Sequence, residues 1–251
     1  MEKKYKTGFV LSGGGARGFA HLGVAKALYE KGIYPDIISG VSSGSIAGVF
    51  LADGWAPDDI FNFFKDTRIF KISRLGIPQD GLLSLDKMKK ELDNALKSRD
   101  IRDLKKPFIV AAANLNTGKI EYFDEGPASN LIMASSAIPV LFSPIHIGDH
   151  LYVDGGLFDN LPVQPLLGKC EKIIGVNVNP IHYKKQLNGL IQVASRAFHL
   201  GVDNTTRESR GKCDIFIEPY KLDQYDILDF KAADQLFRIG YEYVRDIEIE
   251  L

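Results

Sequence analysis

The stretch TGFVLSGGGARGFAHLGVAKAL, residues 7–28, contains the change of pattern that decides the fold. Its apolar run from Phe9 to Leu11 predicts a short buried strand. The glycines at 13–15 then allow a tight turn, and apolar residues from Phe19 onward recur at helical spacing until Gly32. A strand, a glycine turn and a helix in succession are typical of α/β proteins.

A second unit of the same kind follows at once. A short strand is predicted around Ile37 and Ile38, with Gly40 at its end and an apolar helix over 45–51. Continued alternation of this kind predicts an α/β fold with a largely parallel central sheet flanked by helices. Further strands are expected at 108–113, 120–123, 173–178 and 214–217, and further helices near 85–96, 129–136, 187–207 and 229–247.

Composition and charge limit what the chain can be. Its 251 residues are 45% hydrophobic and 25% charged, as in an ordinary soluble globular protein, and one domain over 1–251 is the simplest organisation. The net charge of −1 gives no basic field that would hold nucleic acid. Cys170 and Cys213 are too few for a disulfide framework and lack metal-ligand spacing. With no secretory or membrane-spanning apolar run, we expect a cytoplasmic protein.

The segment 60–83 interrupts the strand and helix alternation. It mixes aromatic and aliphatic residues with Lys and Arg, as in Phe61, Phe64 and Phe70 beside Lys65 and Lys71. Such a mixture is typical of a lid that contacts lipid, but equally of an ordinary helix that packs on the core. Both interpretations stay open from the sequence.

The motif Gly40-Val41-Ser42-Ser43-Gly44 matches the G-x-S-x-G pattern of a nucleophile elbow. Glycines on either side let a strand turn sharply into a helix, which exposes the middle serine, Ser42. A helix N-cap is the simpler role for such a serine. An apolar strand before the motif and an apolar helix after it favour the nucleophile.

The glycine loop at 13–18, Gly-Gly-Gly-Ala-Arg-Gly, also lies between a strand and a helix. It satisfies the G-x-G-x-x-G pattern of dinucleotide-binding folds, but the second strand leads into the Ser42 elbow without the carboxylate that would hold a ribose. The alternative is that backbone N–H groups at the helix start hold the oxyanion of an acyl-transfer intermediate. The second interpretation fits the neighbouring serine better.

A serine nucleophile needs a base, and two kinds are available. In an α/β-hydrolase order the base is a late histidine, His182 or His199, and neither lies in a distinctive turn. The other candidate is Asp154, which ends a short apolar strand and is followed by Gly155 and Gly156. Strand ends are where the active sites of open α/β sheets are assembled.

Four blocks together resemble the bacterial patatin-like phospholipase family. They are the 13–21, 40–45, 134–139 and 153–162 segments, and the resemblance covers about residues 8–180. It implies a patatin-like three-layer fold, with Ser42 as nucleophile, Asp154 as base, and no metal or organic cofactor. It also implies an oxyanion hole built by the loop of Gly13, Gly14, Gly15, Ala16, Arg17 and Gly18. The 134–139 block, Ala-Ser-Ser-Ala-Ile-Pro, receives no chemical role.

The resemblance implies a hydrolase of phospholipid or lysophospholipid esters that makes transient contact with a membrane surface. Val41 replaces a common threonine, which changes nothing in the expected chemistry. An acyltransferase would use the same residues, and a lipid-binding protein without activity would keep the same fold. Arg17 is expected either to pair with an anionic head group or to hold the glycine loop through a salt bridge, and His21 to pack inside the first helix.

Overall fold

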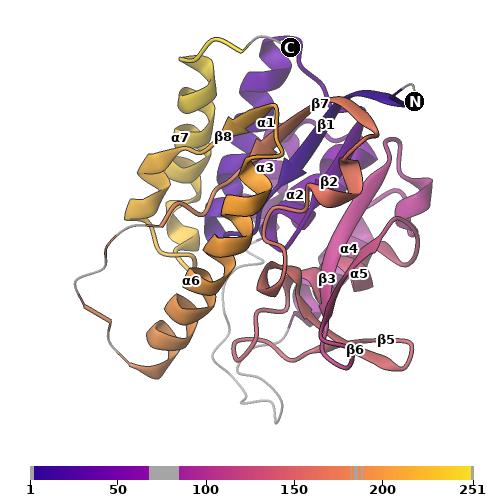
Figure 1. Cartoon of the computed structure of the whole chain (residues 1–251), viewed down its shortest axis with the longest axis vertical. Helices are drawn as coiled ribbons and strands as arrows, with labels where there is room; N and C mark the ends of the chain where they lie inside the picture. The colour runs from indigo at the N-terminus through magenta and orange to yellow at the C-terminus, as the bar shows by residue number, and fades with distance from the viewer. Residues whose placement is uncertain (1–2, 68–84, 182, 184–185, 188, 250–251) are drawn as a thin grey trace.

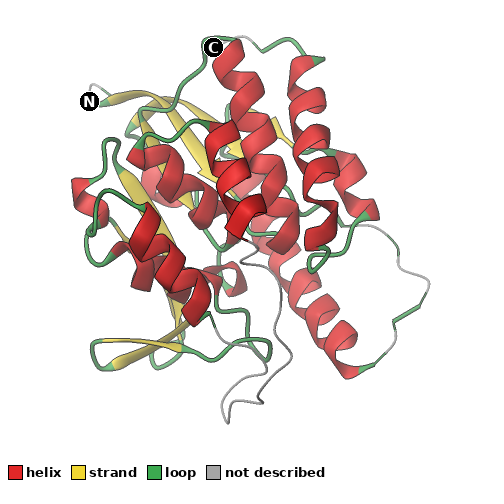
Figure 2. Ribbon diagram, turned by 180° about the vertical axis from the view of Figure 1, so that it is seen from behind, coloured by secondary structure: helices red, strands yellow, loops and turns green. Residues whose placement is uncertain are grey.

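The computed structural model describes residues 3–67, 85–181, 183, 186–187 and 189–249. A central sheet carries helices on both faces (Figures 1 and 2). Its strands run in the order β5-β6-β3-β2-β1-β7-β8, with β4 paired to β3 outside that path. The strands are β1 (Tyr5–Leu11), β2 (Ile37–Gly40), β3 (Phe108–Asn114), β4 (Lys119–Phe123), β5 (Ile145–Ile147), β6 (His150–Asp154), β7 (Cys170–Val176) and β8 (Ile215–Ile217).

The sheet is parallel from β8 to β3 and antiparallel where β4, β5 and β6 join it. The predicted α/β class and the parallel core are therefore confirmed. The antiparallel strands are an addition to the prediction, because their pairing is not written in the local pattern of the chain. Parallel strands need crossover connections, whereas β5 and β6 form a hairpin.

Two strands share one edge of β3, and this determines the geometry of the site. Val110 pairs with Gly40 of β2 and also with β4, so β2 and β4 lie on opposite edges. Ala112 pairs with Asp154 of β6 and also with β4, so β6 lies on the same edge as β2. Because β2 is parallel to β3 and β6 is antiparallel, their carboxyl ends meet head to head beside Ala111.

Side chains of each strand alternate between two apolar layers. Phe9 and Leu11 of β1 enter the larger core cluster, whereas Val10 enters the smaller one on the other face. The larger cluster receives buried residues from six helices, seen together in Figure 2. These are α1 (Phe19–Glu30), α2 (Ser43–Asp53), α3 (Pro57–Thr67), α4 (Asp86–Ala95), α5 (Ala128–Ser136) and α7 (Ala233–Arg245).

The long helix α6 (Leu190–Arg210) lies in front of the sheet in Figure 1, together with the segment that connects β6 to β7. That segment contributes Leu161, Val163 and Leu166 to the smaller apolar cluster. The sheet thus forms the middle of three layers, as the family resemblance implies.

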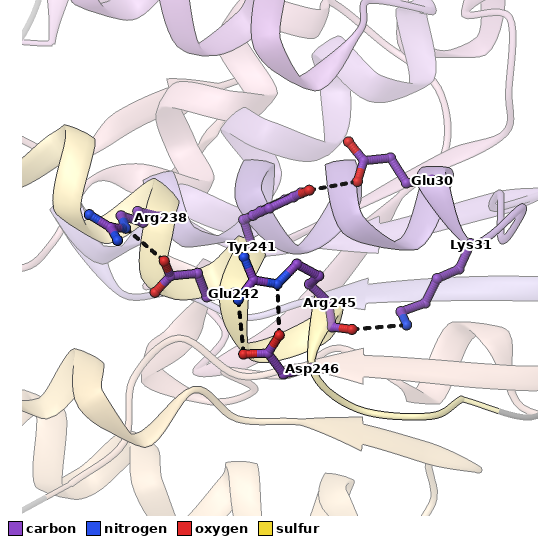
Figure 3. A network of polar contacts seen from close by, with 7 residues as sticks. All are labelled: Glu30, Lys31, Arg238, Tyr241, Glu242, Arg245 and Asp246. Carbon is purple, nitrogen blue, oxygen red and sulfur yellow. Dashed lines mark hydrogen bonds and ion pairs between the residues drawn. The ribbon is translucent and has the colours of Figure 1, made fainter.

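The C-terminal helix α7 packs closely against α1 through two glycines. A Cβ atom on Gly23 would lie 2.0 Å from the carbonyl oxygen of Phe237, and one on Gly240 would lie 2.2 Å from that of Ala20. Polar contacts on the surface of this helix pair are shown in Figure 3, and one of them is the 2.8 Å hydrogen bond from Tyr241 to Glu30. Since exposed contacts of this kind stabilise little, the close helix packing is the main attachment.

The segment 60–83 is described only in part. Phe61 and Phe64 lie on α3, are buried, and pack edge-on against Phe19 of α1. For these two residues the core interpretation is confirmed. Residues 68–84, which include Phe70 and Lys71, lie outside the described residues, so the lid stays a prediction there.

Gly240→Ala is expected to lower the melting temperature, because the added methyl group meets backbone that cannot turn away. Overpacking of this kind costs about 1–3 kcal/mol. The matched control is Gly201→Ala on α6, where an added Cβ has no atom of the described residues within 4 Å. Thermal unfolding followed by circular dichroism measures both. Equal melting temperatures for the two variants would contradict the glycine-mediated packing of α1 on α7.

Candidate active site

Ser42 lies at a sharp turn between β2 and α2, where the backbone is strained. Its φ of 52° and ψ of −126° are rare for a residue with a side chain. Gly44 is needed at this turn, because a Cβ there would lie 2.3 Å from the carbonyl oxygen of Leu11, and one on Gly40 would lie 2.6 Å from that of Gly44. Strain of this kind is typical of functional sites.

The Ser42 side chain makes no capping hydrogen bond to α2, so the N-cap role is not seen. Its hydroxyl instead lies beside the carboxylate of Asp154 and acts on that group as a hydrogen-bond donor that lowers its pKa. Both side chains are buried, with Asp154 only 2% exposed. The head-to-head arrangement of β2 and β6 therefore brings the two predicted site residues into direct contact.

The turn after Asp154 fixes the carboxylate. The Gly156 amide donates a hydrogen bond to Asp154 Oδ1 at 2.8 Å. A Cβ on Gly155 would lie 2.5 Å from the carbonyl oxygen of Ala111, so this position has no room for a larger residue. Burial raises the pKa of the Asp154 carboxyl to about 6, although the hydrogen bonds from Ser42 and Gly156 act in the opposite direction. A carboxylate with this pKa is a stronger base than an ordinary one.

The glycine loop lies against Ser42. A Cβ on Gly13 would lie 3.1 Å from that of Ser42, and one on Gly18 would lie 2.5 Å from that of Ser43. The loop thus lies directly beside the serine elbow, and its role as an oxyanion hole stays a prediction. It enters the short 3₁₀ turn Gly15–Gly18 before α1 begins.

The amides of the loop differ in their availability. The Gly13 amide donates to Asn160 O, the Arg17 amide to Gly14 O, and the Ala16 amide to Ile227 O at 2.7 Å. Within the described part of the chain, the amides of Gly14 and Gly15 have no acceptor. This corrects the expectation for Gly13, Ala16 and Arg17, whose N–H groups are already used. Gly14 and Gly15 are the remaining candidates for oxyanion donors.

Arg17 is buried, with 3% of its surface exposed, and has a structural role instead of being an exposed cation. Its guanidinium donates to Tyr225 O at 2.7 and 3.0 Å, to Asn179 Oδ1 at 3.0 Å and to Pro180 O at 3.3 Å. Burial lowers its pKa to about 10, and Asp226 and Asp223 partly oppose this. The guanidinium therefore holds the glycine loop to two later segments, through carbonyl groups instead of the expected salt bridge.

Among the described residues, no histidine side chain is hydrogen-bonded to Ser42. His21 is buried in α1, as predicted, and its Nε2 lies 2.8 Å from Ser12 O, while burial lowers its pKa to about 4. His146 and His150 are exposed on the β5–β6 hairpin. His182 and the side chain of His199 are outside the described structure, so their exclusion as bases stays a prediction.

Sequence reasoning did not find two supports of the site. Ser135 on α5 accepts a hydrogen bond from the Ser42 amide at 2.9 Å, yet the block that contains it had no assigned role. The backbone at Tyr225 and Ile227 fixes the glycine loop, although only the general character of the last seventy or so residues fits the resemblance. Ser135 could have been found because it lies in the 134–139 block of the resemblance. The backbone at Tyr225 and Ile227 acts through main-chain oxygens, so no side chain in the sequence indicates its role.

Comparison with known proteins identifies the family. A family model described as patatin-like phospholipase matches residues 9–167, which include Ser42, Asp154 and the glycine loop. The chain belongs to this patatin-like phospholipase family.

Relatives extend the match over different shares of the chain. The lysophospholipase NTE1 of Candida albicans is 26% identical and covers 96% of this chain and 20% of its own length. An uncharacterized NTE family protein of Mycobacterium bovis is 33% identical and covers 69% of this chain and 49% of its own length. The structure of VipD from Legionella pneumophila covers 94% of this chain and 67% of its own, with 15% identity and a TM-score of 0.49. The chain thus spans about a fifth to a half of these two curated relatives.

The described residues contain neither a metal-binding cluster nor a membrane-spanning helix. No three His, Cys, Asp or Glu side chains in the described ranges are grouped so that they could hold a metal ion. Across the same part of the patatin-like chain, no helix has both the length and the apolar character to cross a bilayer.

Asp154→Asn is expected to raise the melting temperature at pH 8 and to change it little at pH 4. The folded protein retains the Asp154 proton up to about pH 6, whereas an unfolded chain releases it near pH 4. The stabilisation from this proton is complete below about pH 4 and is lost as the pH rises through 6. Removing the buried charge at pH 8 therefore stabilises the fold, by at most about 3 kcal/mol.

Thermal unfolding of the wild type and the variant between pH 4 and pH 8 measures this difference. Protonation of His21 affects both proteins alike and cancels. Asp149→Asn, at an exposed turn of the β5–β6 hairpin, is the matched control and should follow the wild type at every pH. A difference between Asp154→Asn and the wild type that does not vary with pH would contradict the raised pKa.

Proposed function

We propose that this patatin-like chain is a serine lipid acyl hydrolase that cleaves phospholipid or lysophospholipid esters through an acyl-Ser42 intermediate. The observation that carries the proposal is the position of the Ser42 hydroxyl beside the buried Asp154 carboxylate, next to a loop in which the amides of Gly14 and Gly15 have no acceptor among the described residues. A strained nucleophile, a base and adjacent N–H donors are the parts that acyl transfer needs.

The first half of the reaction follows from these positions. Ser42 Oγ attacks the ester carbonyl carbon while Asp154 takes its proton. The carbonyl oxygen becomes an oxyanion, and the amides of Gly14 and Gly15 stabilise it by hydrogen bonds. The intermediate collapses, the bond to the alcohol oxygen breaks, and Asp154 returns the proton to that oxygen. The alcohol leaves and the acyl group remains on Ser42.

The second half repeats the chemistry with water. Asp154 takes a proton from a water molecule whose oxygen attacks the acyl-Ser42 carbonyl carbon. The same amides hold the second oxyanion, the bond to Ser42 Oγ breaks, and Asp154 gives the proton back to Ser42. The fatty acid is released. An alcohol in place of water would give acyl transfer, so product analysis separates hydrolase from transferase.

Exposed apolar side chains beside the site support a lipid substrate. Val140 is 59% exposed and has a φ of 73°, which is a strained conformation for a β-branched residue. It follows the Ala137 carbonyl that accepts the Asp154 amide at 2.9 Å, so it lies in the loop next to the base. Phe158, in the turn after Asp154, is 39% exposed. These residues would meet acyl chains or a membrane surface during transient contact.

The names of the relatives agree with this substrate class. The proteins of Candida albicans and Saccharomyces cerevisiae that match this chain are named lysophospholipases. Their similarity supports a lysophospholipid ester as the first substrate to test.

Ser42→Ala and Asp154→Asn are each expected to reduce ester hydrolysis by several orders of magnitude, because nucleophile and base act as one unit. The double variant should be little worse than either single one. Ser43→Ala is the matched control, since its hydroxyl is buried without a partner in the described structure. Hydrolysis of a lysophospholipid and labelling by a fluorophosphonate probe are measured for the four variants and the wild type.

The wild type should be labelled at Ser42 and Ser42→Ala should not. Full activity of Asp154→Asn would contradict the assignment of the Asp154 carboxylate as the base. His182→Ala and His199→Ala are expected to retain most activity, and a loss in either on the scale of Ser42→Ala, without loss of thermal stability, would assign the base to that histidine.

Hydrolysis is expected to fall as the pH is lowered through about 6. The base must be a carboxylate, and the raised pKa of Asp154 places its protonation in this range rather than near 4. A pH profile of kcat/KM on a short soluble ester measures the midpoint. A midpoint near 4 would contradict a buried carboxylate as the base.

A further inference from the structure

The gap between β2 and β6 is closed by a side chain instead of by a strand. β2 pairs with β3 as far as Val110, and β6 pairs with it from Ala112. Ala111 lies between these two pairings. The Ser135 hydroxyl donates a hydrogen bond to the Ala111 carbonyl oxygen at 2.7 Å. A backbone carbonyl at the break in the ladder is thus satisfied by α5.

The same hydroxyl reaches the nucleophile. Ser135 Oγ accepts a hydrogen bond from the Ser42 amide at 2.9 Å. A serine hydroxyl has one proton, and donating it to Ala111 leaves the oxygen lone pairs for the Ser42 N–H. Ser135 is 0% exposed, so water does not compete for either partner. The strained Ser42 backbone is therefore tied to the sheet by one hydroxyl group.

The base is tied to the same end of α5. The Asp154 amide donates to Ala137 O at 2.9 Å, two residues after Ser135. One short segment, 135–137, therefore holds the backbones of both Ser42 and Asp154. A small shift of this segment would change the separation of the two reacting side chains.

We propose that Ser135 is a positioning residue for the reaction, whose hydroxyl fixes the Ser42 backbone so that the Ser42 hydroxyl points at Asp154. The proposal rests on the proposed function. Ser135 has no part in the proton transfer between Ser42 and Asp154 and no contact with the ester in this mechanism. It acts only through the Ser42 amide, and its effect should appear in turnover and not in substrate binding.

The neighbouring serine provides a matched control. Ser136 is also buried on α5, but its hydroxyl has no hydrogen-bond partner among the described residues. Ser135→Ala and Ser136→Ala therefore remove the same atom from adjacent positions. Only the first removes the bridge.

The test compares the two variants with the wild type on a short soluble ester. We expect Ser135→Ala to lower kcat and the rate of fluorophosphonate labelling about 100-fold, as for a small misplacement of a reacting group, with KM nearly unchanged. The midpoint of the acid limb should also move to higher pH, because the hydrogen bond from Ser42 lowers the pKa of Asp154 and is weakened here. Ser136→Ala should match the wild type in all four measured quantities.

A second variant covers the case in which Ser135→Ala does not fold. Ser135→Cys keeps a side chain of similar size with a weak S–H donor, and it should shift kcat and the pH midpoint in the same direction by less. If Ser135→Ala or Ser135→Cys lowers the melting temperature while kcat and the pH midpoint stay at the values of Ser136→Ala, Ser135 has a structural role only and the proposal is wrong.

Failure of the proposed function gives a different result. In that case the wild type itself is neither labelled at Ser42 nor active on any ester. The position of Ser42 can still be measured without activity, from the pH dependence of thermal stability that reports the pKa of Asp154. An unchanged dependence in Ser135→Ala would then overturn the positioning role independently.

Discussion

The site depends on one constraint, the head-to-head meeting of two strands on a single edge of β3. The parallel strand β2 arrives from one direction and ends in the serine elbow, and the antiparallel strand β6 arrives from the other and ends in Asp154. Their ends leave one residue of β3, Ala111, between them. The register of both strands on β3 therefore places the serine elbow next to the carboxylate.

The features of Ser42 and Asp154 that the reaction needs also lower the stability of the fold. A buried carboxylate and a non-glycine residue at positive φ are both unfavourable. They persist because a hydrogen bond from the Gly156 amide holds the carboxylate, while Ser135 Oγ and Ala137 O accept hydrogen bonds from the amides of Ser42 and Asp154. Trade-offs of this kind between stability and activity are general in enzymes. The large apolar cluster between the sheet and its six helices stabilises the fold and offsets the unfavourable conformation of Ser42 and the buried charge of Asp154.

The local parts of the site could be predicted from the sequence, because glycine spacing and a strand before a helix are written in consecutive residues. The Ser42 elbow, the glycine loop and the Asp154 turn are all of this kind. The direction of β6, the bridge through Ser135 and the use of the Ala16 amide could not be predicted, since each depends on residues distant in the chain. Phe61 and Phe64 were ambiguous because aromatic residues beside lysine occur both in core helices and at lipid surfaces.

The glycine loop is held by oxygen atoms of the main chain at Tyr225, Ile227 and Pro180. Every amino acid has such an oxygen, so these hydrogen bonds require a particular backbone course and no particular side chain. Asn179, which accepts from Arg17 through its side-chain Oδ1, is the exception. Loops of equal length and backbone course could therefore be exchanged there in protein design. Arg17, which donates to the carbonyl oxygens of Tyr225 and Pro180, has no substitute with the same planar set of donors.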